Sequence, residues 1–190
     1  FVGFTSFGTK LAFGAKKYGS AQNGLWITDG TEAGTTRLYE VTGSEEMTGV
    51  AAVGGSLYAT TRGVAYYNCV SSAGAFLKSD GTLGGTTKVI GYGCFDYAEK
   101  GFNDIGVLGT GLVMSHYSAA TGWELWKSDG TSAGTVAVKD IVDGWVDSNP
   151  YDFFPISSTQ TVFHAGTGSG YELWVTDGTA AGTKLLLTNA

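Results

Sequence analysis

The sequence predicts an all-β fold assembled from four repeats of about 50 residues. One string recurs four times, as "GLWITDGTEAGT" from Gly24, "AFLKSDGTLGGT" from Ala75, "ELWKSDGTSAGT" from Glu124 and "ELWVTDGTAAGT" from Glu172. Each copy also holds four short segments that are rich in β-branched or aromatic residues and are bounded by turn-forming residues, which is typical of strands. The chain has 31 Gly and only 2 Pro, and this much Gly favours tight turns over helices.

We label the four segments of each copy A, B, C and D in chain order. The expected A strands are "FVGFTSF", "TGVAAVG", "IGVLG" and "DFFPISS", and the expected D strands are "TTRLYEV", "TTKVIGY", "TVAVKDI" and "TKLLLT". In the third copy, B is "LVMSH" and C is "WELWKS". All four copies are therefore complete.

Four short antiparallel strands in each repeat of this length are typical of the blade of a β-propeller. The sequence predicts four blades, either closed into a four-bladed ring or forming a segment of a longer propeller or array. We expect one repeat domain over residues 1–190, with blades at about 1–46, 47–97, 98–148 and 149–190.

Composition and charge exclude some classes of function. The net charge is −6, the isoelectric point is near 4.7, and the 11 basic residues are scattered, so binding to nucleic acid is disfavoured. No apolar run approaches the ~18 residues of a membrane span. The chain begins with "FVGF", and we expect it to be a processed product or a part of something longer.

The string "ELWKSDGTSAGT" with a following "VKDI" resembles the repeat of large secreted or surface-displayed bacterial proteins. That repeat reads ELW, any residue, S or T, DGT, two variable residues and GT. Copies three and four match it closely, whereas copy two has Phe76 and Leu77 in place of Leu and Trp, and copies one and two lack the Glu. The resemblance implies an extracellular repeat module and implies no particular ligand or activity.

The repeated Asp should fasten the turn between strands C and D. A carboxylate can accept hydrogen bonds from amides of its own turn, Gly can adopt a positive φ, and Thr adds hydroxyls. The position is similar to the Asp-box turn of sialidase-type propellers, which is structural. We interpret Asp29, Asp80, Asp129 and Asp177 as structural turn residues, with a cation or ligand role as the alternative, and we expect Trp26, Trp126 and Trp174 to fill the space between adjacent blades.

Function is expected where the copies differ. The A to B and C to D turns of a propeller lie on one face, and the B to C and D to A connections lie on the other. On this second face the sequence is irregular and rich in aromatic residues, which is where a rigid repeat scaffold commonly binds. The candidate binding residues are Trp145, Tyr66, Tyr67, Tyr92, Tyr97, Tyr117 and Tyr18. The alternative is that these rings cover small local cores.

The same face carries both cysteines, Cys69 and Cys94. We expect them to form a disulfide in an oxidising compartment. Asp143, Asp147 and Asn149 lie close together in sequence and are a weak candidate for a calcium site, which is the one cofactor that the sequence suggests.

We predict that the chain is not an enzyme and has no catalytic residues. His116 and His164 lie on strand B of neighbouring copies but are offset by one position, so their side chains should point to opposite faces of their sheets. A sialidase needs three Arg around its substrate carboxylate, and this chain has only Arg37 and Arg62.

The predicted function is a non-catalytic extracellular structural or adhesive module of a surface or filament assembly, whose partners are copies of itself or neighbouring modules. The alternatives are a carbohydrate-binding propeller and a glycoside hydrolase built on Asp96, Asp104, Asp143 and Asp147. Neither membrane insertion nor nucleic acid is expected.

Overall fold

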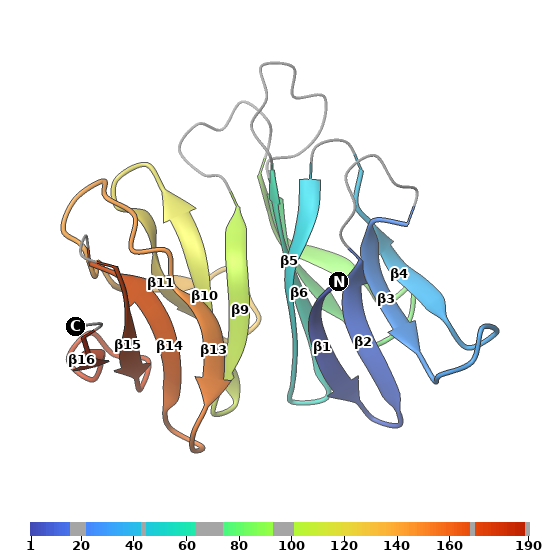
Figure 1. Cartoon of the computed structure of the whole chain (residues 1–190). Helices are drawn as coiled ribbons and strands as arrows, with labels where there is room; N and C mark the ends of the chain where they lie inside the picture. The colour runs from blue at the N-terminus through green and yellow to red at the C-terminus, as the bar shows by residue number, and fades with distance from the viewer. Residues whose placement is uncertain (16–21, 43–44, 64–73, 93–100, 168–169, 189–190) are drawn as a thin grey trace. The chain divides into compact units, whose positions relative to one another are not determined.

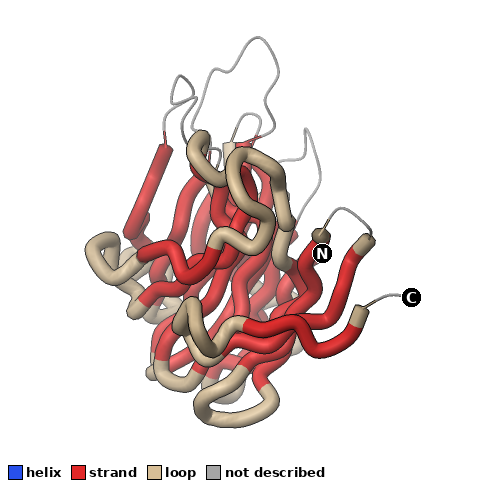
Figure 2. The backbone as a smooth tube through the Cα atoms, turned by 90° about the vertical axis from the view of Figure 1, so that its left-hand side faces the viewer, coloured by secondary structure: helices blue, strands red, loops and turns tan. Residues whose placement is uncertain are grey.

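The computed structural model describes residues 1–190 except 16–21, 43–44, 64–73, 93–100, 168–169 and 189–190. All regular secondary structure in the described part is β-strand, as Figure 2 shows. No helix of sufficient length and hydropathy to span a bilayer occurs among these residues.

The strands form four antiparallel sheets in which consecutive strands are neighbours, and we call these sheets blades 1 to 4. Their bounds are β1 (Val2–Phe7), β2 (Lys10–Ala15), β3 (Gly24–Thr28), β4 (Thr36–Glu40); β5 (Glu45–Val53), β6 (Ser56–Gly63), β7 (Gly74–Ser79), β8 (Thr87–Tyr92); β9 (Phe102–Leu108), β10 (Gly111–Ser118), β11 (Gly122–Ser128), β12 (Val136–Lys139); and β13 (Tyr151–Pro155), β14 (Thr161–Gly166), β15 (Tyr171–Thr176), β16 (Lys184–Leu187). The prediction of four four-stranded blades is confirmed.

Three strand ends differ from the sequence-based expectation. Blade 2 begins at Glu45, two residues before the predicted boundary, and β9 begins at Phe102, three residues before the predicted segment "IGVLG". β13 ends at Pro155 because the amides of Ile156 and Ser157 both donate to the carbonyl of Gln160, which closes the turn early.

The chain divides into two compact units, Phe1–Phe102 and Asn103–Ala190. The first contains blades 1 and 2, and the second contains blades 3 and 4, with β9 starting at the last residue of the first. Within each unit the A to B turns of both blades lie at the same end (Figure 1). We call the end of a unit with the A to B and C to D turns its turn end, and the opposite end its loop end.

Each unit has its own core between its two blades. In the first unit Ala12 and Ile27 of blade 1 pack with Leu57 and Leu77 of blade 2. In the second unit Val113, Leu125, Phe163 and Trp174 make the equivalent core. The expectation that a repeat Trp fills the space between blades is confirmed at Trp174, which is only 8% exposed.

Glycine permits the innermost strands of neighbouring blades to approach closely. A Cβ on Gly3 of β1 would overlap the backbone of Val50 in β5, and a Cβ on Gly106 of β9 would overlap Phe153 in β13. The same device therefore sets the spacing of the blades in both units.

The pairing of strands C and D is irregular at one equivalent place in all four blades. The register shifts between Leu25 and Trp26 in blade 1 and between Leu125 and Trp126 in blade 3, and blades 2 and 4 shift at the same position of the repeat. A bulge at this position increases the local twist of the outer strand.

The C to D turn of blade 3 is organised by the Asp129 carboxylate. Its Oδ1 accepts hydrogen bonds from the amide of Thr131 at 2.9 Å and from the hydroxyl of the same residue at 2.7 Å. The Thr131 hydroxyl in turn accepts from the amide of Gly134 at 3.0 Å. A side chain at Gly134 would overlap the carboxylate, so the second Gly of the motif is required because the turn folds tightly over its Asp.

Two further hydroxyls close the turn of blade 3. Thr135 Oγ1 donates to the carbonyl of Thr131 at 2.7 Å and lies 2.8 Å from Ser128 Oγ, which accepts from the amide of Gly130. Because Gly130 has φ of 86°, a left-handed conformation, glycine is also favoured at the first Gly of the motif.

The other three turns repeat this network. Asp29, Asp80 and Asp177 each accept from the amide and the hydroxyl of the Thr two positions later. These hydrogen bonds, the one from the Thr hydroxyl first, lower the pKa of all three carboxyl groups. The geometry is the structural turn that the sequence predicts for these residues.

Replacing Thr131 by Val should destabilise the protein by about 1 kcal/mol, because the turn loses a donor to Asp129 and an acceptor for Gly134. Thermal denaturation should show a lower melting temperature for Thr131→Val. Ser132→Ala is the matched control, since this exposed position of the same turn differs between the four copies. Equal melting temperatures for Thr131→Val and the control would show that the network does not stabilise the fold.

Candidate functional site

The structure describes three of the seven predicted binding residues. Tyr92 is half-buried against Phe102, with ring centroids 5.9 Å apart, and Tyr117 is half-buried against Trp123 at 5.6 Å. Trp145 is 81% exposed. Tyr18, Tyr66, Tyr67 and Tyr97 lie outside the described residues, as do Cys69, Cys94 and Asp96, so the predicted disulfide stays a prediction.

Trp145 lies in the connection 140–150 from blade 3 to blade 4, at the loop end of the second unit. Its neighbour Val146 is also exposed. The connection runs beside the start of β11, where the amide of Trp123 donates to Asp147 Oδ1 at 2.9 Å and the amide of Ser148 donates to the carbonyl of Trp123 at 3.0 Å. A side chain at Gly122 would overlap Asp147, so this part of the connection lies tightly against the sheet.

The carboxylate of Glu124 holds the same connection from the inside. Its Oε2 accepts from the amide of Ile141 at 2.8 Å and from the hydroxyl of Ser148 at 2.6 Å, and its Oε1 accepts from the amide of Ser148 at 3.0 Å. Glu124 is buried, and burial raises its pKa to about 7 although the hydrogen bonds oppose that shift. The two ends of the connection are thus fastened to one side chain.

A second group of aromatic residues lies at the loop end of blade 4. The ring of Tyr151 lies 5.0 Å from that of Tyr171 and 5.2 Å from that of His164. His164 Nδ1 is 3.7 Å from the carboxylate of Asp152, and Tyr171 is exposed. The amide of Gly166, the last residue of β14, donates to the carbonyl of Ser148 at 2.7 Å, so the end of β14 and the connection that carries Trp145 are joined directly.

Two carboxylates lie on the innermost strands of the second unit. Asp104 accepts from the amide of Ile105 and, at 2.8 Å, from the amide of Asp152. Burial raises the pKa of Asp104 to about 6, and the negative charge of Asp152 adds to that shift. Asp152 itself has φ of 56°, a left-handed conformation that is unusual for a residue other than Gly. Asp104 therefore joins blade 3 to blade 4.

One candidate calcium ligand already has a partner, because Asp147 Oδ1 accepts a hydrogen bond from the amide of Trp123. Asn149 has a left-handed backbone conformation, with φ of 45°. No group of three or more His, Cys, Asp or Glu within the described ranges is arranged to hold a metal ion. A calcium site at Asp143, Asp147 and Asn149 stays a prediction.

The two histidines occupy opposite faces of their sheets. His116 pairs with Glu124 and His164 pairs with Leu173, which is one position further along the motif. His116 is buried against the ring of Trp126 at 4.4 Å, and burial lowers its pKa to about 4. A buried imidazole that stays neutral is typical of a histidine in a protein core.

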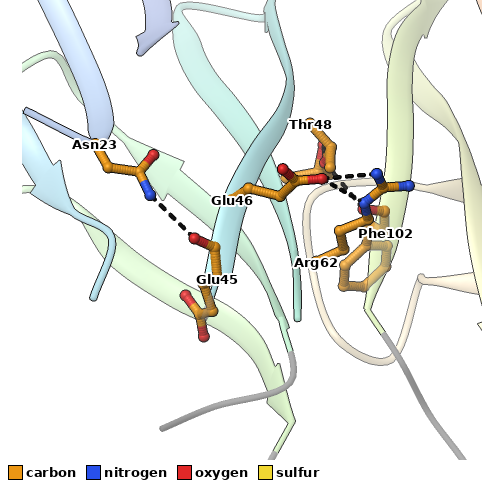
Figure 3. A network of polar contacts seen from close by, with 7 residues as sticks. Asn23, Glu45, Glu46, Thr48, Arg62 and Phe102 are labelled. Atoms are coloured by element: carbon orange, nitrogen blue, oxygen red, sulfur yellow. Dashed lines mark hydrogen bonds and ion pairs between the residues drawn. The ribbon is translucent and has the colours of Figure 1, made fainter. Parts of the chain in front are cut away.

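The first unit contains a polar network at the start of β5, shown in Figure 3. Asn23 Nδ2 donates to the carbonyl of Glu45 at 3.0 Å, Arg62 binds Glu46 at 2.7 Å, and Thr48 donates to the carbonyl of Phe102 at 2.9 Å. Glu45 is buried, and burial raises its pKa to about 7. These contacts join residues of the first unit, of which Phe102 is the last, and we assign them a structural role.

A hollow of about 660 Å³ lies at the turn end of the second unit, between β9, β11 and the C to D turn of blade 4. Its charged residues are Lys127, which donates to the carbonyl of Gly178 at 2.8 Å, and Asp177, which is held in its own turn. The hollow therefore presents no charged group that is available to a ligand among its described lining residues.

Sequence reasoning missed the roles of Glu124 and Asp104. Both are carboxylates within strands, and Glu124 lies between the apolar residues Trp123 and Leu125. For Glu124 the sequence does contain a signal, which is that a Glu recurs directly before a buried Leu. A carboxylate beside the core requires hydrogen-bond donors around it, so this pattern indicates that such donors are present. The donors come from Ile141 and Ser148, and nothing in the sequence marks them.

No family model matches the chain, and no curated protein matches it significantly. Solved structures do match. A puromycin hydrolase superposes with a TM-score of 0.61 at 15% identity, over 94% of this chain and 27% of that one. A prolyl endopeptidase gives 0.59 at 12% identity, over 94% and 24%.

The exo-beta-1,3-galactanase of Phanerochaete chrysosporium, with beta-1,3-galactotriose, gives a TM-score of 0.52 at 9% identity, over 97% of this chain and 49% of that one. The chain thus spans about a quarter of the length of the prolyl endopeptidase and of the puromycin hydrolase, and about half that of the galactanase. Similarity at such low identity shows the fold alone. Together with the four four-stranded sheets, it shows that the chain has the fold of β-propeller proteins.

Proposed function

We propose that this chain is a non-catalytic extracellular adhesive module that binds carbohydrate through the loop end of its second unit. The observation that carries the proposal is the exposure of Trp145, 81%, on a connection that is fastened to the sheet. A Trp that packs in a core is shielded from solvent, whereas a ring that stacks on a sugar must be accessible.

The support beneath Trp145 favours a preformed binding site. Glu124 holds both Ile141 and Ser148, and Asp147 holds the amide of Trp123. Side chains on a loop that is already ordered lose less conformational entropy on binding. Extracellular location comes from the resemblance to secreted and surface-displayed repeat proteins and is part of the proposal.

The chemistry of the surrounding residues favours a sugar over other ligands. Tyr151 and Tyr171 provide further rings, and Asp152 and His164 provide hydrogen-bonding groups beside them. The net charge of −6 disfavours polyanions. The fold is shared with a galactanase whose structure holds beta-1,3-galactotriose, and this makes β-linked galactans the first ligands to test.

Trp145→Ala should weaken binding to β-linked oligosaccharides by about 2 kcal/mol, roughly thirtyfold, because the exposed ring is the main stacking surface. Binding should be measured by titration calorimetry with β-1,3-galactotriose and by an array of other glycans. Trp145→Phe should restore part of the affinity, since it retains a flat ring.

Leu83→Ala is the matched control, because Leu83 is an exposed apolar residue in a turn of the first unit. It should leave binding unchanged. The proposal is contradicted if the chain binds no glycan at millimolar concentration, or if Trp145→Ala binds as tightly as the unchanged chain.

A second candidate function is glycoside hydrolysis, which the pair Asp104 and Asp152 favours. A half-buried carboxyl with a pKa of about 6 beside an exposed carboxylate is the arrangement of a general acid with an ionised partner. Sugar release from bound oligosaccharide, abolished by Asp104→Asn while binding persists, would establish this candidate and exclude the non-catalytic one.

A further inference from the structure

The sequence contains five Asp-Gly pairs, and one of them lies outside the repeated turns. Four pairs belong to the C to D turns, and the fifth is Asp143–Gly144, in the connection that carries Trp145. An Asp that precedes a Gly is prone to close a ring on its own backbone, because Gly has no Cβ to hinder the approach of its amide nitrogen to the Asp side chain. The contacts of each pair decide whether that approach is open.

The backbone conformation of the Gly does not distinguish the five pairs. Gly144 has φ of 93°, Gly30 has the same value, and Gly130 has φ of 86°. The difference between the pairs therefore lies in what holds the two reacting groups, which are the Asp carboxyl and the amide nitrogen of the Gly.

The C to D turns hold both reacting groups. In blade 3 the carboxylate of Asp129 accepts from the amide and the hydroxyl of Thr131, and the amide of Gly130 donates to Ser128 Oγ at 3.0 Å. Gly134 lies so close to the carboxylate that a Cβ on it would overlap it. The other three turns hold their carboxylate and their Gly amide in the same way. Ring closure in a turn must first break these hydrogen bonds.

The pair Asp143–Gly144 has no such network. Both residues are exposed, and no described residue donates a hydrogen bond to the Asp143 carboxylate. The amide of Gly144 donates to Asp140 Oδ2 at 3.2 Å, in an exposed position. The carboxyl of Asp143 can therefore turn toward the Gly144 amide at little cost.

The exposure of this pair is local to its part of the connection. Asp147–Ser148 also joins an Asp to a small residue, but Asp147 Oδ1 accepts from the amide of Trp123. The amide of Ser148 donates to the carbonyl of Trp123 and to Glu124 Oε1, each at 3.0 Å. The connection is thus fixed at Ser148 and open at Asp143.

The pair Asn23–Gly24 could close the same ring with loss of ammonia, and the structure protects it. Asn23 is 5% exposed, and its Nδ2 donates to the carbonyl of Glu45 at 3.0 Å. Gly24 is the first residue of β3 and pairs with Glu40. Asn23 should therefore stay unreacted in the folded chain.

We propose that Asp143 is a site of spontaneous isomerisation to isoaspartate, and that it is the reactive one of the five Asp-Gly pairs. The amide nitrogen of Gly144 attacks Cγ of Asp143. The N–Cγ bond forms, a Cγ–O bond breaks, and the carboxyl hydroxyl leaves with the amide proton as water. Water then opens the resulting succinimide. Opening at the backbone carbonyl of Asp143 gives isoaspartate, and opening at Cγ restores Asp.

Isomerisation would alter the backbone directly before Trp145. In isoaspartate the chain passes through Cβ and Cγ, so the backbone is longer by one carbon and the free carboxylate is attached to Cα. The reaction takes place within one chain and needs only water. It is therefore independent of what Trp145 binds, and the proposal does not rest on the carbohydrate binding proposed above.

The test is to incubate the folded chain 1–190 for several weeks at neutral pH and physiological temperature. Chymotryptic peptides would be separated by chromatography, and electron-transfer fragmentation would locate isoaspartate in each. Methylation by an isoaspartyl methyltransferase would quantify it. Isoaspartate should form at Asp143 at least about tenfold faster than at the four Asp of the C to D turns, because these four must first lose hydrogen bonds.

The chain unfolded in guanidinium chloride is the matched control. Unfolding removes the contacts that distinguish the pairs, so all five Asp-Gly pairs should then react at similar rates. Asp143→Glu is the control for the assignment, since Glu would have to close a less favourable six-membered ring. This variant changes one exposed side chain, and it should fold normally and form no isoaspartate in the connection.

Two outcomes would overturn the proposal. One is isoaspartate that forms in the folded chain no faster at Asp143 than at Asp129 and its three equivalents. The other is an isoaspartate signal in the connection 140–150 that persists in Asp143→Glu, since a different residue would then be its source.

Discussion

Trp174→Ala should lower the free energy of unfolding by about 3–5 kcal/mol, the range for deleting a buried aromatic side chain. Trp174 is 8% exposed and packs with Val113, Leu125 and Phe163 between blades 3 and 4. Its loss would open a cavity between two sheets, and sheets held by glycine contacts such as that of Gly106 can collapse only partly. Urea denaturation followed by fluorescence and by circular dichroism would measure the change.

Trp145→Ala is the matched control for the same type of substitution. Because the ring of Trp145 is exposed, we expect its loss to change the free energy of unfolding by no more than about 0.5 kcal/mol. A large destabilisation by Trp145→Ala together with a small one by Trp174→Ala would mean that the core between blades 3 and 4 is wrongly assigned.

Glu124→Gln should destabilise the protein by about 1–3 kcal/mol near pH 5, where the native carboxyl is neutral. A neutral carboxyl can donate to Ser148 Oγ and still accept both amides. The Gln amide can satisfy the amide of Ser148 with its oxygen, but its nitrogen would then face the amide of Ile141, and two donors would meet.

The same substitution should change how stability depends on pH. The pKa of Glu124 rises from 4.5 to about 7 on folding, so the folded state binds this proton more tightly than the unfolded state does. Its contribution to stability is therefore complete below about pH 4.5 and is lost as the pH rises through 7. The difference in unfolding free energy between the unchanged chain and Glu124→Gln should shrink by about 1–3 kcal/mol from pH 5 to pH 8.

Glu172→Gln is the control for this second prediction. Glu172 is the equivalent residue of blade 4 and accepts a hydrogen bond from Thr167 Oγ1 at 2.7 Å, which the oxygen of Gln can accept as well. Parallel denaturation curves at pH 5 and pH 8 for Glu124→Gln and the unchanged chain would refute the assigned role of Glu124.

The fold was predictable because its signals are local and repeated. Each Asp of the DGT string forms its hydrogen bonds with a Thr two positions away, so the sequence of the turn contains all of its partners. The strands could also be predicted from the sequence where β-branched and aromatic residues dominate. The start of β9 was missed because Asn103 and Asp104 are polar, and Asp104 is tolerated there only because the amide of Asp152 reaches it from another blade.

The candidate site was less predictable because its contacts are distant in the sequence. The exposed position of Trp145 could be expected from the polar connection in which it lies. The hydrogen bonds of Glu124 that hold this connection could not be expected, since Glu124 and Ser148 are 24 positions apart in the sequence. His164 and Asp152 likewise meet only because β13 and β14 pair.

The hydrogen-bond network of the C to D turn is complete within each blade, so a blade can be duplicated as one unit. Its bonds join residues no more than seven positions apart, so a duplicated gene segment carries every group that its turn needs. A newly inserted blade has to match its neighbours only at the two faces of its sheet. Proteins built from this repeat can therefore lengthen or shorten by whole blades, while the loops at the opposite end diversify without endangering the turn.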